Sequence, residues 1–325
     1  MKRRQVLGQF AAVAIAGMAT HANGQNFPSK PIKIIVPYAA GGSPDIVARI
    51  VSQFLLGVLG QPVVVENQPG SSGIAAIENV RNLAADGHTL LMADAGHWAV
   101  NRVTKLKLPY NFQKDMEPIT IASTSSLFLT VHESFPGSNL REVVAAIKAK
   151  PGTYSYGSSG VGSLHHLTME AFKAGLGLDI LHIPYKGTGQ SVPALASGQV
   201  LLAVAAYNSV AAFAKAGRVK IIAANTREPS SLLPQFPSMG DAGIRDFDFP
   251  GENALFAVAG TPKPVIDKLA AAVAKVLAMP EVIAKLHAAG VEPPKTPTPA
   301  ALAETIQRDI PRYAQVVKAA GIQPE

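Results

Sequence analysis

The sequence predicts an α/β protein built from two sheet units. Three observations lead to this prediction. Short β-branched runs alternate with helical stretches, the alternation starts again near residue 140, and a stretch rich in Pro, Gly and Ser precedes a last strand and three helices. Strand-helix alternation is typical of α/β architecture, and about 300 residues can form two cores of ordinary domain size.

The first 24 residues have the pattern of an export signal. Lys2, Arg3 and Arg4 form a positive head, and an uncharged apolar run follows from Val6 to Ala19, before small residues at 20 and 22. This order predicts removal during export. The apolar run is shorter than the ~20 residues of a membrane span. The paired arginines resemble a twin-arginine signal, general secretion fits nearly as well, and the export route stays open.

The first set of elements begins with a strand at residues 32–36, which stops at Pro37. A helix is expected over 44–59, because apolar residues recur there at helical spacing. The set continues with strands at 62–65, 89–92, 119–122 and 127–131 and a helix at 74–84.

The second set contains further strands and helices, and residues 228–250 then form a long crossing segment. Helices are expected at 140–149, 164–174, 191–197 and 209–216, and strands at 154–156, 181–183, 200–205 and 219–223. A late strand at 254–258 and helices at 264–278, 281–289 and 299–319 complete the chain.

Four strand-to-helix turns, at 38–45, 67–73, 157–166 and 185–190, are rich in Gly and small hydroxyl residues. Ligands of open α/β sheets bind beyond the carboxyl ends of strands, where helix N-termini present N–H groups. In the first turn, Ser43 suits the N-cap position and Pro44 the first helical position. Any one of these turns fits a well-capped helix or a flexible loop. Four together predict a cleft suited to an anion.

Composition excludes several other classes of protein. The formal charge is +7, and three of these charges belong to the export signal. Basic residues are scattered and only 6% of residues are aromatic, which argues against nucleic-acid binding. There is no cysteine, so we expect neither a disulfide nor a lipid-anchored Cys. These features predict a freely soluble protein of a Gram-negative periplasm.

Catalytic and metal motifs are weak. Neither Ser-rich turn has the Gly-x-Ser-x-Gly pattern, and the chain has no phosphate-loop or dinucleotide fingerprint. His165 and His166 are adjacent and point about 100° apart on a helix, unlike zinc pairs four residues apart. Asp94 and His97 lie just beyond a strand and could line a cleft, but no third partner is evident, and Trp98 beside them suits a core. We therefore predict no catalytic residue, cofactor or metal.

Six segments, in the same order along the chain, resemble those of a known family. They are the opening Pro28–Pro37 with Gly41-Gly42-Ser43, Val65–Gly70 with Gly73, Asp86–Leu91, Lys150–Ser163 with His166, Pro184–Gly187, and Gly260-Thr261-Pro262. Together they resemble the substrate-binding proteins of tripartite tricarboxylate transporters, the Bug-type receptors. The resemblance covers essentially the whole mature chain.

The resemblance implies a type II periplasmic binding fold with a hinge and a central ligand cleft. Lobe 1 would comprise 25–126 plus 251–325, and lobe 2 would comprise 127–250. Family ligands are mostly carboxylates, including di- and tricarboxylates, aromatic acids and some amino acids. A monomeric receptor would deliver its ligand to membrane permease subunits without chemistry. The implied ligand contacts are Tyr38, Gly41, Gly42, Ser43, Asn67, Gly70, Ser71, Gly73, Ser158, Gly160, Gly162, Ser163, His166, Tyr185 and Thr188.

One departure from the family and two alternatives stay open. Acidic residues that the family often has after a Gly-x-Val are replaced here by the apolar run 201–206. This predicts a less negative cleft that prefers a plain carboxylate to an amino acid. The alternatives are a receptor that presents its ligand to a sensor kinase, and a secreted hydrolase using Ser159 or Ser163 with His166.

Overall fold

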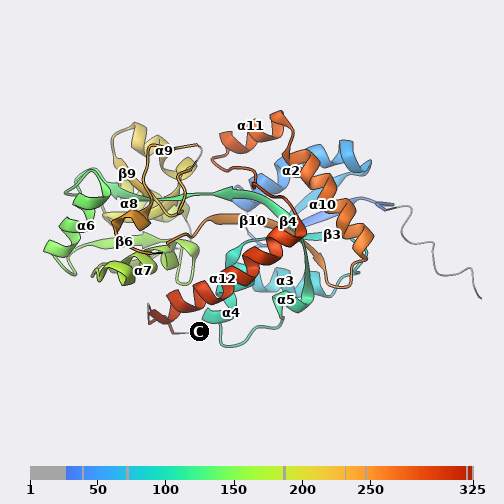
Figure 1. The fold of residues 1–325 in the computed structure, drawn as a ribbon, viewed down its shortest axis with the longest axis horizontal. Coiled ribbons are helices and arrows are strands. Elements are labelled where there is room, and N and C mark those ends of the chain that lie inside the picture. The colour runs from blue at the N-terminus through green and yellow to red at the C-terminus, as the bar shows by residue number, and fades with distance from the viewer. Residues whose placement is uncertain are drawn as a thin grey trace, which may run out of the picture.

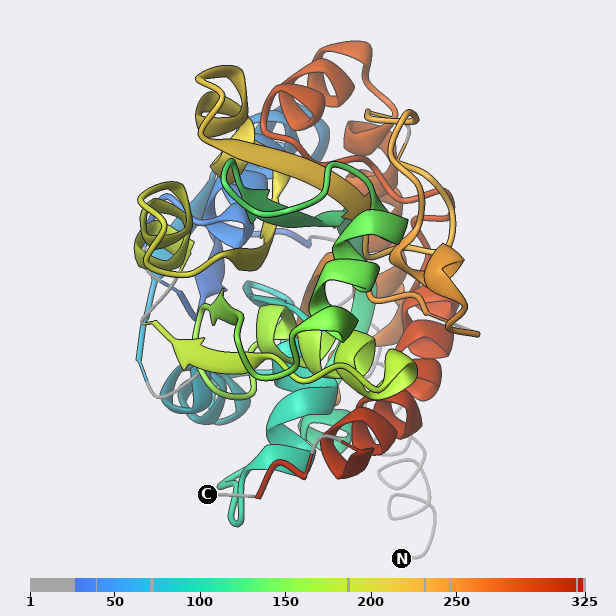
Figure 2. The same cartoon turned by 90° about the vertical axis from the view of Figure 1, so that its left-hand side faces the viewer.

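The computed structural model describes residues 27–38, 40–70, 73–185, 188–230, 232–245, 247–319 and 321–323. The predicted export signal lies outside these residues. Figure 1 shows two α/β lobes side by side along the long axis of the molecule. In the end-on view of Figure 2, one lobe lies in front of the other.

Lobe 1 is built around a five-stranded sheet in the order β2-β1-β3-β10-β4. Strands β1, β2 and β3 are parallel, whereas β10 is antiparallel to both of its neighbours. The strands are β1 (Ile32–Val36), β2 (Val63–Asn67), β3 (Thr89–Ala93), β4 (Met116–Ser125) and β10 (Gly251–Val258). The last strand in sequence, β10, therefore lies between β3 and β4 rather than at an edge of the sheet.

Lobe 2 repeats this plan in the order β7-β6-β8-β5-β9. Strand β6 is parallel to β7 and β8, and β5 is antiparallel to β8 and β9. The strands are β5 (Leu127–His132), β6 (Ser155–Ser158), β7 (Leu181–Pro184), β8 (Leu202–Ala206) and β9 (Val219–Ala224). In each sheet four strands thus run in one direction, and the single reversed strand, β10 or β5, lies next to the edge strand.

Helices cover both sheets, as expected when parallel strands are joined by crossovers. In lobe 1 they are α2 (Ser43–Leu59), α3 (Ile74–Arg81), a π-helix η2 (Gly96–Val100), α4 (Asn101–Thr104), α5 (Phe112–Asp115), α10 (Lys263–Leu277) and α11 (Pro280–Ala288). In lobe 2 they are α6 (Leu140–Ala149), α7 (Leu164–Leu176), α8 (Thr188–Ala196), α9 (Tyr207–Lys215) and the short 3₁₀ helix η3 (Met239–Ala242).

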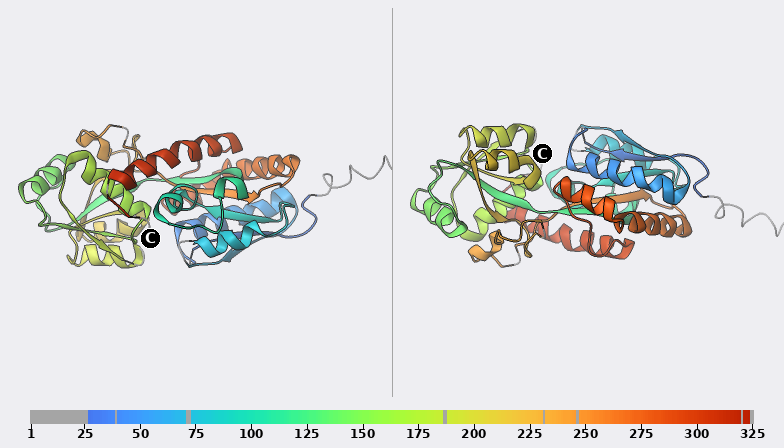
Figure 3. Two further views of the ribbon diagram at one scale, coloured as in Figure 1. Left: turned by 90° about the horizontal axis from the view of Figure 1, so that it is seen from below. Right: turned by 90° about the horizontal axis from the view of Figure 1, so that it is seen from above.

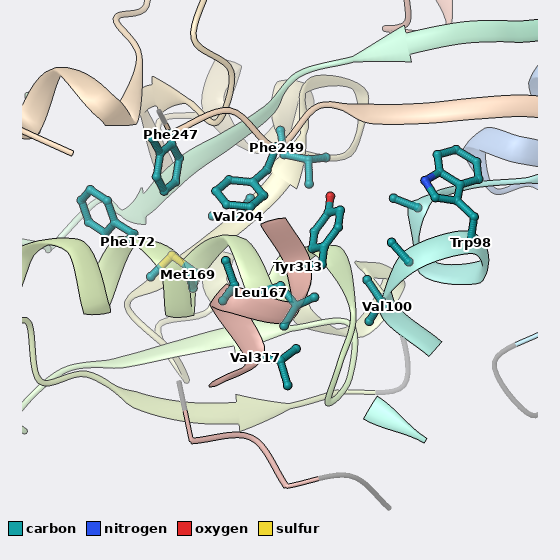
Figure 4. Close-up of a cluster of buried hydrophobic side chains, with 14 of the residues drawn as sticks. Trp98, Val100, Leu167, Met169, Phe172, Val204, Phe247, Phe249, Tyr313 and Val317 are labelled. Atoms are coloured by element: carbon teal, nitrogen blue, oxygen red, sulfur yellow. The ribbon is translucent and has the colours of Figure 1, made fainter. Parts of the chain in front are cut away.

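The last helix, α12 (Pro299–Ala319), connects the two lobes. It packs against β4 and η2 of lobe 1 and against α7 of lobe 2, and Figure 3 shows it running along both. Tyr313 and Val317 of α12 belong to the same buried cluster as Trp98 and Leu167 (Figure 4). A continuous apolar core therefore passes through α12 from one lobe to the other.

Trp98 is fully buried, as its sequence context predicts, and its indole N–H donates to Asp309 Oδ2 of α12 at 3.2 Å. A second core cluster packs α2 and α10 on the other face of the lobe 1 sheet, around Val47, Leu55 and Leu269. The apolar stripe predicted for residues 44–59 thus faces the sheet, with Val47 and Leu55 fully buried.

Candidate functional site

The first two predicted turns lie side by side in lobe 1. Tyr38 lies two residues after the end of β1, and Asn67 is the last residue of the parallel neighbour β2. Asn67 was expected in a turn, but it pairs with Val36 and so extends the strand. Its side-chain amide donates to the carbonyl of Tyr38 at 3.1 Å, which joins the two turns.

An ionised carboxylate organises the first turn. The N–H of Gly41 donates to Asp45 Oδ2 at 2.9 Å, and Asp45 forms a 2.9 Å ion pair with Arg49. Burial alone would raise the pKa of Asp45, but its bonds to Arg49 and Gly41 lower it. Gly41, with a φ of 87°, is exposed together with Gly42. The backbone there is accessible from outside.

Ser43 is not the N-cap that the sequence predicts. Gly42 takes that position in extended conformation, and Ser43 is the first helical residue. The Ser43 hydroxyl oxygen instead accepts a hydrogen bond from Asn253 Nδ2 of β10 at 3.2 Å, and the same amide reaches Ser123 Oγ at 3.0 Å. Asn253 therefore ties the start of α2 to the sheet, a contact that sequence patterns did not reveal.

The two described glycines of the second turn differ in exposure. Gly70 is exposed, and its carbonyl accepts from the N–H of Gly73 at 2.9 Å. Gly73 is buried, with a φ of 78°, and an added Cβ would lie 2.3 Å from His97 Nε2. Only glycine fits this position, so Gly73 serves packing. Ser71 lies outside the described residues.

Asp94 and His97 gain the third partner that the sequence did not identify, and it is Tyr38. The phenol of Tyr38 donates to Asp94 Oδ2 at 2.6 Å, and His97 Nδ1 lies 2.9 Å from Oδ1. Burial and the neighbouring Asp94 charge raise the pKa of Tyr38 well above its usual value, so the phenol stays neutral. These three residues form a polar cluster at the carboxyl ends of β1 and β3.

The third and fourth predicted turns lie side by side in lobe 2. Ser158 was expected in a turn but belongs to β6, where it pairs with Pro184 of β7. Its carbonyl accepts from the N–H of Tyr185 at 3.1 Å, and Thr188 begins α8 just beyond. The Ser158 hydroxyl is buried and lies 2.7 Å from His182 Nε2.

The N-terminus of α7 is capped from within its own turn. Ser163 is the N-cap, accepting from the N–H of His166 at 3.2 Å and donating to the carbonyl of Gly160 at 2.7 Å. The His166 ring accepts from the N–H of Gly162 at 3.1 Å and stacks on His182, with ring centroids 4.0 Å apart. Ser158 and His166 are therefore committed to holding this turn.

Burial lowers the pKa of three histidines of lobe 2, His165, His166 and His182, which favours their neutral forms. Burial, together with the neighbouring His166, lowers the pKa of His182 to about 4. Burial also lowers the pKa of His165 to about 4. A positive charge on either ring is disfavoured because the surrounding protein replaces water.

Ser159 pairs with His165 rather than with His166. Ser159 Oγ lies 2.8 Å from His165 Nδ1, whereas Ser163 contacts only the backbone N–H of His166. A general base works best when its pKa is near the operating pH, and His165 falls well below that range. The geometry expected for the hydrolase alternative is therefore not formed with His166.

The third turn, in lobe 2, lies close to lobe 1 residues beyond β3. The charge of Asp94 in lobe 1 acts on His165 in lobe 2. An atom added to Gly162 of lobe 2 would lie 3.6 Å from Thr104 Oγ1 of lobe 1. Three side chains at this boundary between the lobes are partly exposed: Tyr38, Asp94 and His165. Burial is nevertheless the largest single influence on the pKa of each of them. This combination is expected of side chains that line a recessed crevice.

The predicted contacts separate by exposure. Gly41, Gly42 and Gly70 are exposed, whereas Gly73, Ser158 and His166 are buried supports. The partly exposed members are Tyr38, Ser43, Asn67, Gly160, Gly162, Ser163, Tyr185 and Thr188.

A buried ionic cluster lies where β10 enters lobe 1. Glu252 lies 3.7 Å from the guanidinium of Arg308, which bonds Asp309 at 3.0 Å. Burial and the charge of Asp309 raise the pKa of Glu252 to about 7. Because Asp309 also bonds Trp98, this cluster joins α12 to both β10 and the π-helix η2.

Two cavities are present in the described part of the chain, and the first adjoins the polar cluster through His97. One, of about 140 Å³, is lined by His97, Trp98 and residues of the 102–113 segment. The other, of about 480 Å³, lies between α9 and residues 233–236. Within the described part of the chain, no group of three metal-ligating side chains comes together, and no helix is long and apolar enough to cross a membrane.

Comparison with known proteins places these features in a family. A family model described as "Tripartite tricarboxylate transporter family receptor" matches residues 47–322. The protein BugT of Bordetella pertussis is 31% identical over 317 residues, covering 97% of this chain and 96% of BugT.

Two solved structures from Rhodopseudomonas palustris have the same fold. Rpa4515 with adipate is 28% identical with a TM-score of 0.83, covering 92% of this chain and all of that one. MatC (Rpa3494) with bound malate is 30% identical with a TM-score of 0.77, covering 90% of this chain and all of that one. These likenesses confirm both the predicted resemblance and the two-lobe fold.

Proposed function

The chain belongs to the tripartite tricarboxylate transporter receptor family, and we propose that it binds a small carboxylate between its lobes and delivers it to a membrane permease. One observation carries the proposal: each lobe has a pair of turns at the carboxyl ends of parallel strands, and, against the larger effect of burial, the charge of Asp94 beside one pair raises the pKa of His165 in the other lobe. The similar proteins that hold adipate and malate support a carboxylate ligand.

The proposed mechanism is binding without chemistry. The N-termini of α2 and α7 supply N–H groups and the positive end of a helix dipole to the carboxylate. Exposed Gly41 and Gly42 allow close approach from lobe 1, and Gly160 and Gly162 do so from lobe 2. Closure of the lobes about the segments near 126–127 and 250–251 excludes water from the ligand.

We further propose export to the periplasm after removal of residues 1–24, action as a monomer, and lobe boundaries at 126/127 and 250/251. Family membership and the pattern of the first 24 residues support export to the periplasm.

The test is a calorimetric titration and a thermal-shift screen with malate, adipate, citrate, benzoate and glutamate. A ligand at 100 times its Kd should stabilise the folded form by about 2.7 kcal/mol. The expected result is at least one acid that binds and is recovered unchanged. Failure of every acid to bind would reject the proposal, and turnover of the ligand would reject binding without chemistry.

Two variants locate the site. Ser43→Ala in lobe 1 and Thr188→Ala in lobe 2 should each weaken binding about fivefold, the effect of one lost hydrogen bond of about 1 kcal/mol. Ser134→Ala is the matched control, because exposed Ser134 follows β5 at the opposite edge of the lobe 2 sheet. Equal effects of all three variants would place the ligand elsewhere.

A further inference from the structure

Asp94 occupies a place that the family resemblance did not assign. It follows β3 directly, at the same sheet edge as Tyr38 after β1, because β1 and β3 are parallel. Its side chain keeps 29% of its surface exposed. Its charge also acts on His165 of the other lobe. Asp94 therefore faces the space between the lobes.

The surroundings of Asp94 keep its carboxylate ionised. Oδ1 accepts from the N–H of Gly96 at 2.9 Å and lies 2.9 Å from His97 Nδ1, and Oδ2 accepts from Tyr38 at 2.6 Å. Burial, the largest single influence, would raise the pKa of Asp94, but its bonding partners outweigh burial and lower it. Around neutral pH the carboxylate is negatively charged.

This carboxylate also has capacity for another donor. An ionised carboxyl group offers about four acceptor positions, and the hydrogen bonds from Gly96 and Tyr38 use two of them. His97 Nδ1 lies near Oδ1 but itself accepts from the backbone N–H of Asp94 at 3.2 Å. Because the side chain of Asp94 is partly exposed, its carboxylate is open to a further donor. The facing ring of His165 does not neutralise the charge, because burial keeps that ring uncharged. A molecule held there meets a fixed negative charge that accepts hydrogen bonds.

We propose that Asp94 selects small acids whose second polar group is a hydrogen-bond donor, a hydroxyl or an ammonium, over acids that end in a second carboxylate. This inference rests on the proposed function. The ligand carboxylate lies toward the helix N-termini, and its donor end bonds Asp94. A second carboxylate placed there would be repelled by a like charge.

The prediction that residues 201–206 make the cleft less negative concerns a different strand, β8. The negative charge in this protein comes instead from the turn after β3.

Two series of acids of matched length test the inference by calorimetry. One comprises adipate, 6-hydroxyhexanoate, 6-aminohexanoate and hexanoate, and the other succinate, 4-hydroxybutyrate, 4-aminobutyrate and butyrate. In the series whose chain length binds more tightly, the acid that ends in a hydroxyl or ammonium should bind at least about tenfold more tightly than the dicarboxylate. The reason is that two like charges in contact cost more than the 1.4 kcal/mol that corresponds to a tenfold change in affinity. The Asp94→Asn variant should lose this preference, chiefly by binding the dicarboxylate more tightly.

Two further variants separate specificity from structure. Asp267→Asn removes the same charge from an exposed position on α10, where Asp267 pairs with Lys263, and should leave every affinity ratio unchanged. Tyr38→Phe removes one donor to Asp94 but keeps its charge, so the preference for donor-ended acids should persist. A melting curve for each variant identifies any that does not fold.

The outcomes of this experiment are distinct. A dicarboxylate that binds the wild type as tightly as its donor-ended analogue, with a ratio unchanged in Asp94→Asn, would overturn the inference and leave the proposed function intact. If no acid of these series or of the wider screen binds the wild type, the proposed function itself fails.

Discussion

The two lobes share one strand plan but hold their glycine-rich turns by different chemistry. In lobe 1, ionised carboxylates organise the turns: Asp45 bonds Gly41 and Arg49, and Asp94 gathers Tyr38 and His97. In lobe 2, neutral imidazoles and hydroxyls do so. Ser158 contacts His182, and His166 accepts from Gly162.

The difference shows that a shared backbone arrangement does not impose one means of support. A buried carboxylate needs hydrogen-bond donors, so a change in packing that displaces those donors destabilises the turn it supports. A buried neutral imidazole instead destabilises its turn when acid protonates the ring. We therefore expect steric substitutions to destabilise the turns of lobe 1 and a fall in pH to destabilise the turns of lobe 2. Three predictions test this contrast.

The largest expected effect compares one glycine from each lobe. Gly73 and Gly162 both have positive φ, 78° and 75°, so alanine strains either backbone by about 1 kcal/mol. At Gly73 the new Cβ also overlaps His97 Nε2 at 2.3 Å, whereas at Gly162 its nearest neighbour lies at an ordinary 3.6 Å. Urea unfolding should show Gly73→Ala losing about 3 kcal/mol and Gly162→Ala about 1 kcal/mol. Equal losses would mean that His97 moves aside freely.

A smaller effect should appear in lobe 2 as acid is added. The pKa of His182 is about 4 in the folded protein and 6.5 ordinarily. A lowered pKa gives stability that is present above pH 6.5 and is lost as the pH falls toward 4. His182→Gln keeps an amide for Ser158 but cannot titrate, so between pH 7 and pH 5 the wild type should lose about 1 kcal/mol more than the variant.

The measurement is the free energy of unfolding of both proteins at each pH. Taking the difference between them cancels the other titrating groups, including Glu252, whose raised pKa acts in the opposite direction. Parallel curves for the two proteins would refute a neutral, buried His182.

The smallest effect distinguishes the helix starts of the two lobes. Ser163 caps α7 through the N–H of His166, so Ser163→Ala should cost about 1 kcal/mol. Ser43 is not a cap and only accepts one bond from Asn253, so Ser43→Ala should cost about 0.5 kcal/mol. Thermal unfolding of the two variants measures which one loses more stability. A larger loss of stability for Ser43→Ala would indicate that Ser43 is the N-cap of α2 after all, as the sequence predicts.

Much of the local structure followed from sequence patterns. The strand at Ile32–Val36, the helix at Leu140–Ala149 and the helix at Pro299–Ala319 have the predicted bounds. Pro, Gly or a capping residue lies at the ends of each element, and the spacing of its apolar residues fits either a strand or a helix but not both. The helices between residues 96 and 115 were not predicted, because they are short and their burial depends on packing against α12 and β4.

Taken alone, the sequence determined the alternation of strands and helices, the four glycine-rich turns and the family resemblance, because these depend on neighbours a few residues apart. Tertiary structure decided which turn residues are supports and which are exposed. Asn67 and Ser158 became strand residues only through pairing with β1 and β7. Asp94 acquired Tyr38, 56 residues away, and an opposing His165 from the other lobe. Hydrogen bonding and burial are set by what lies nearby in space, and the fold brings those partners together from distant parts of the chain.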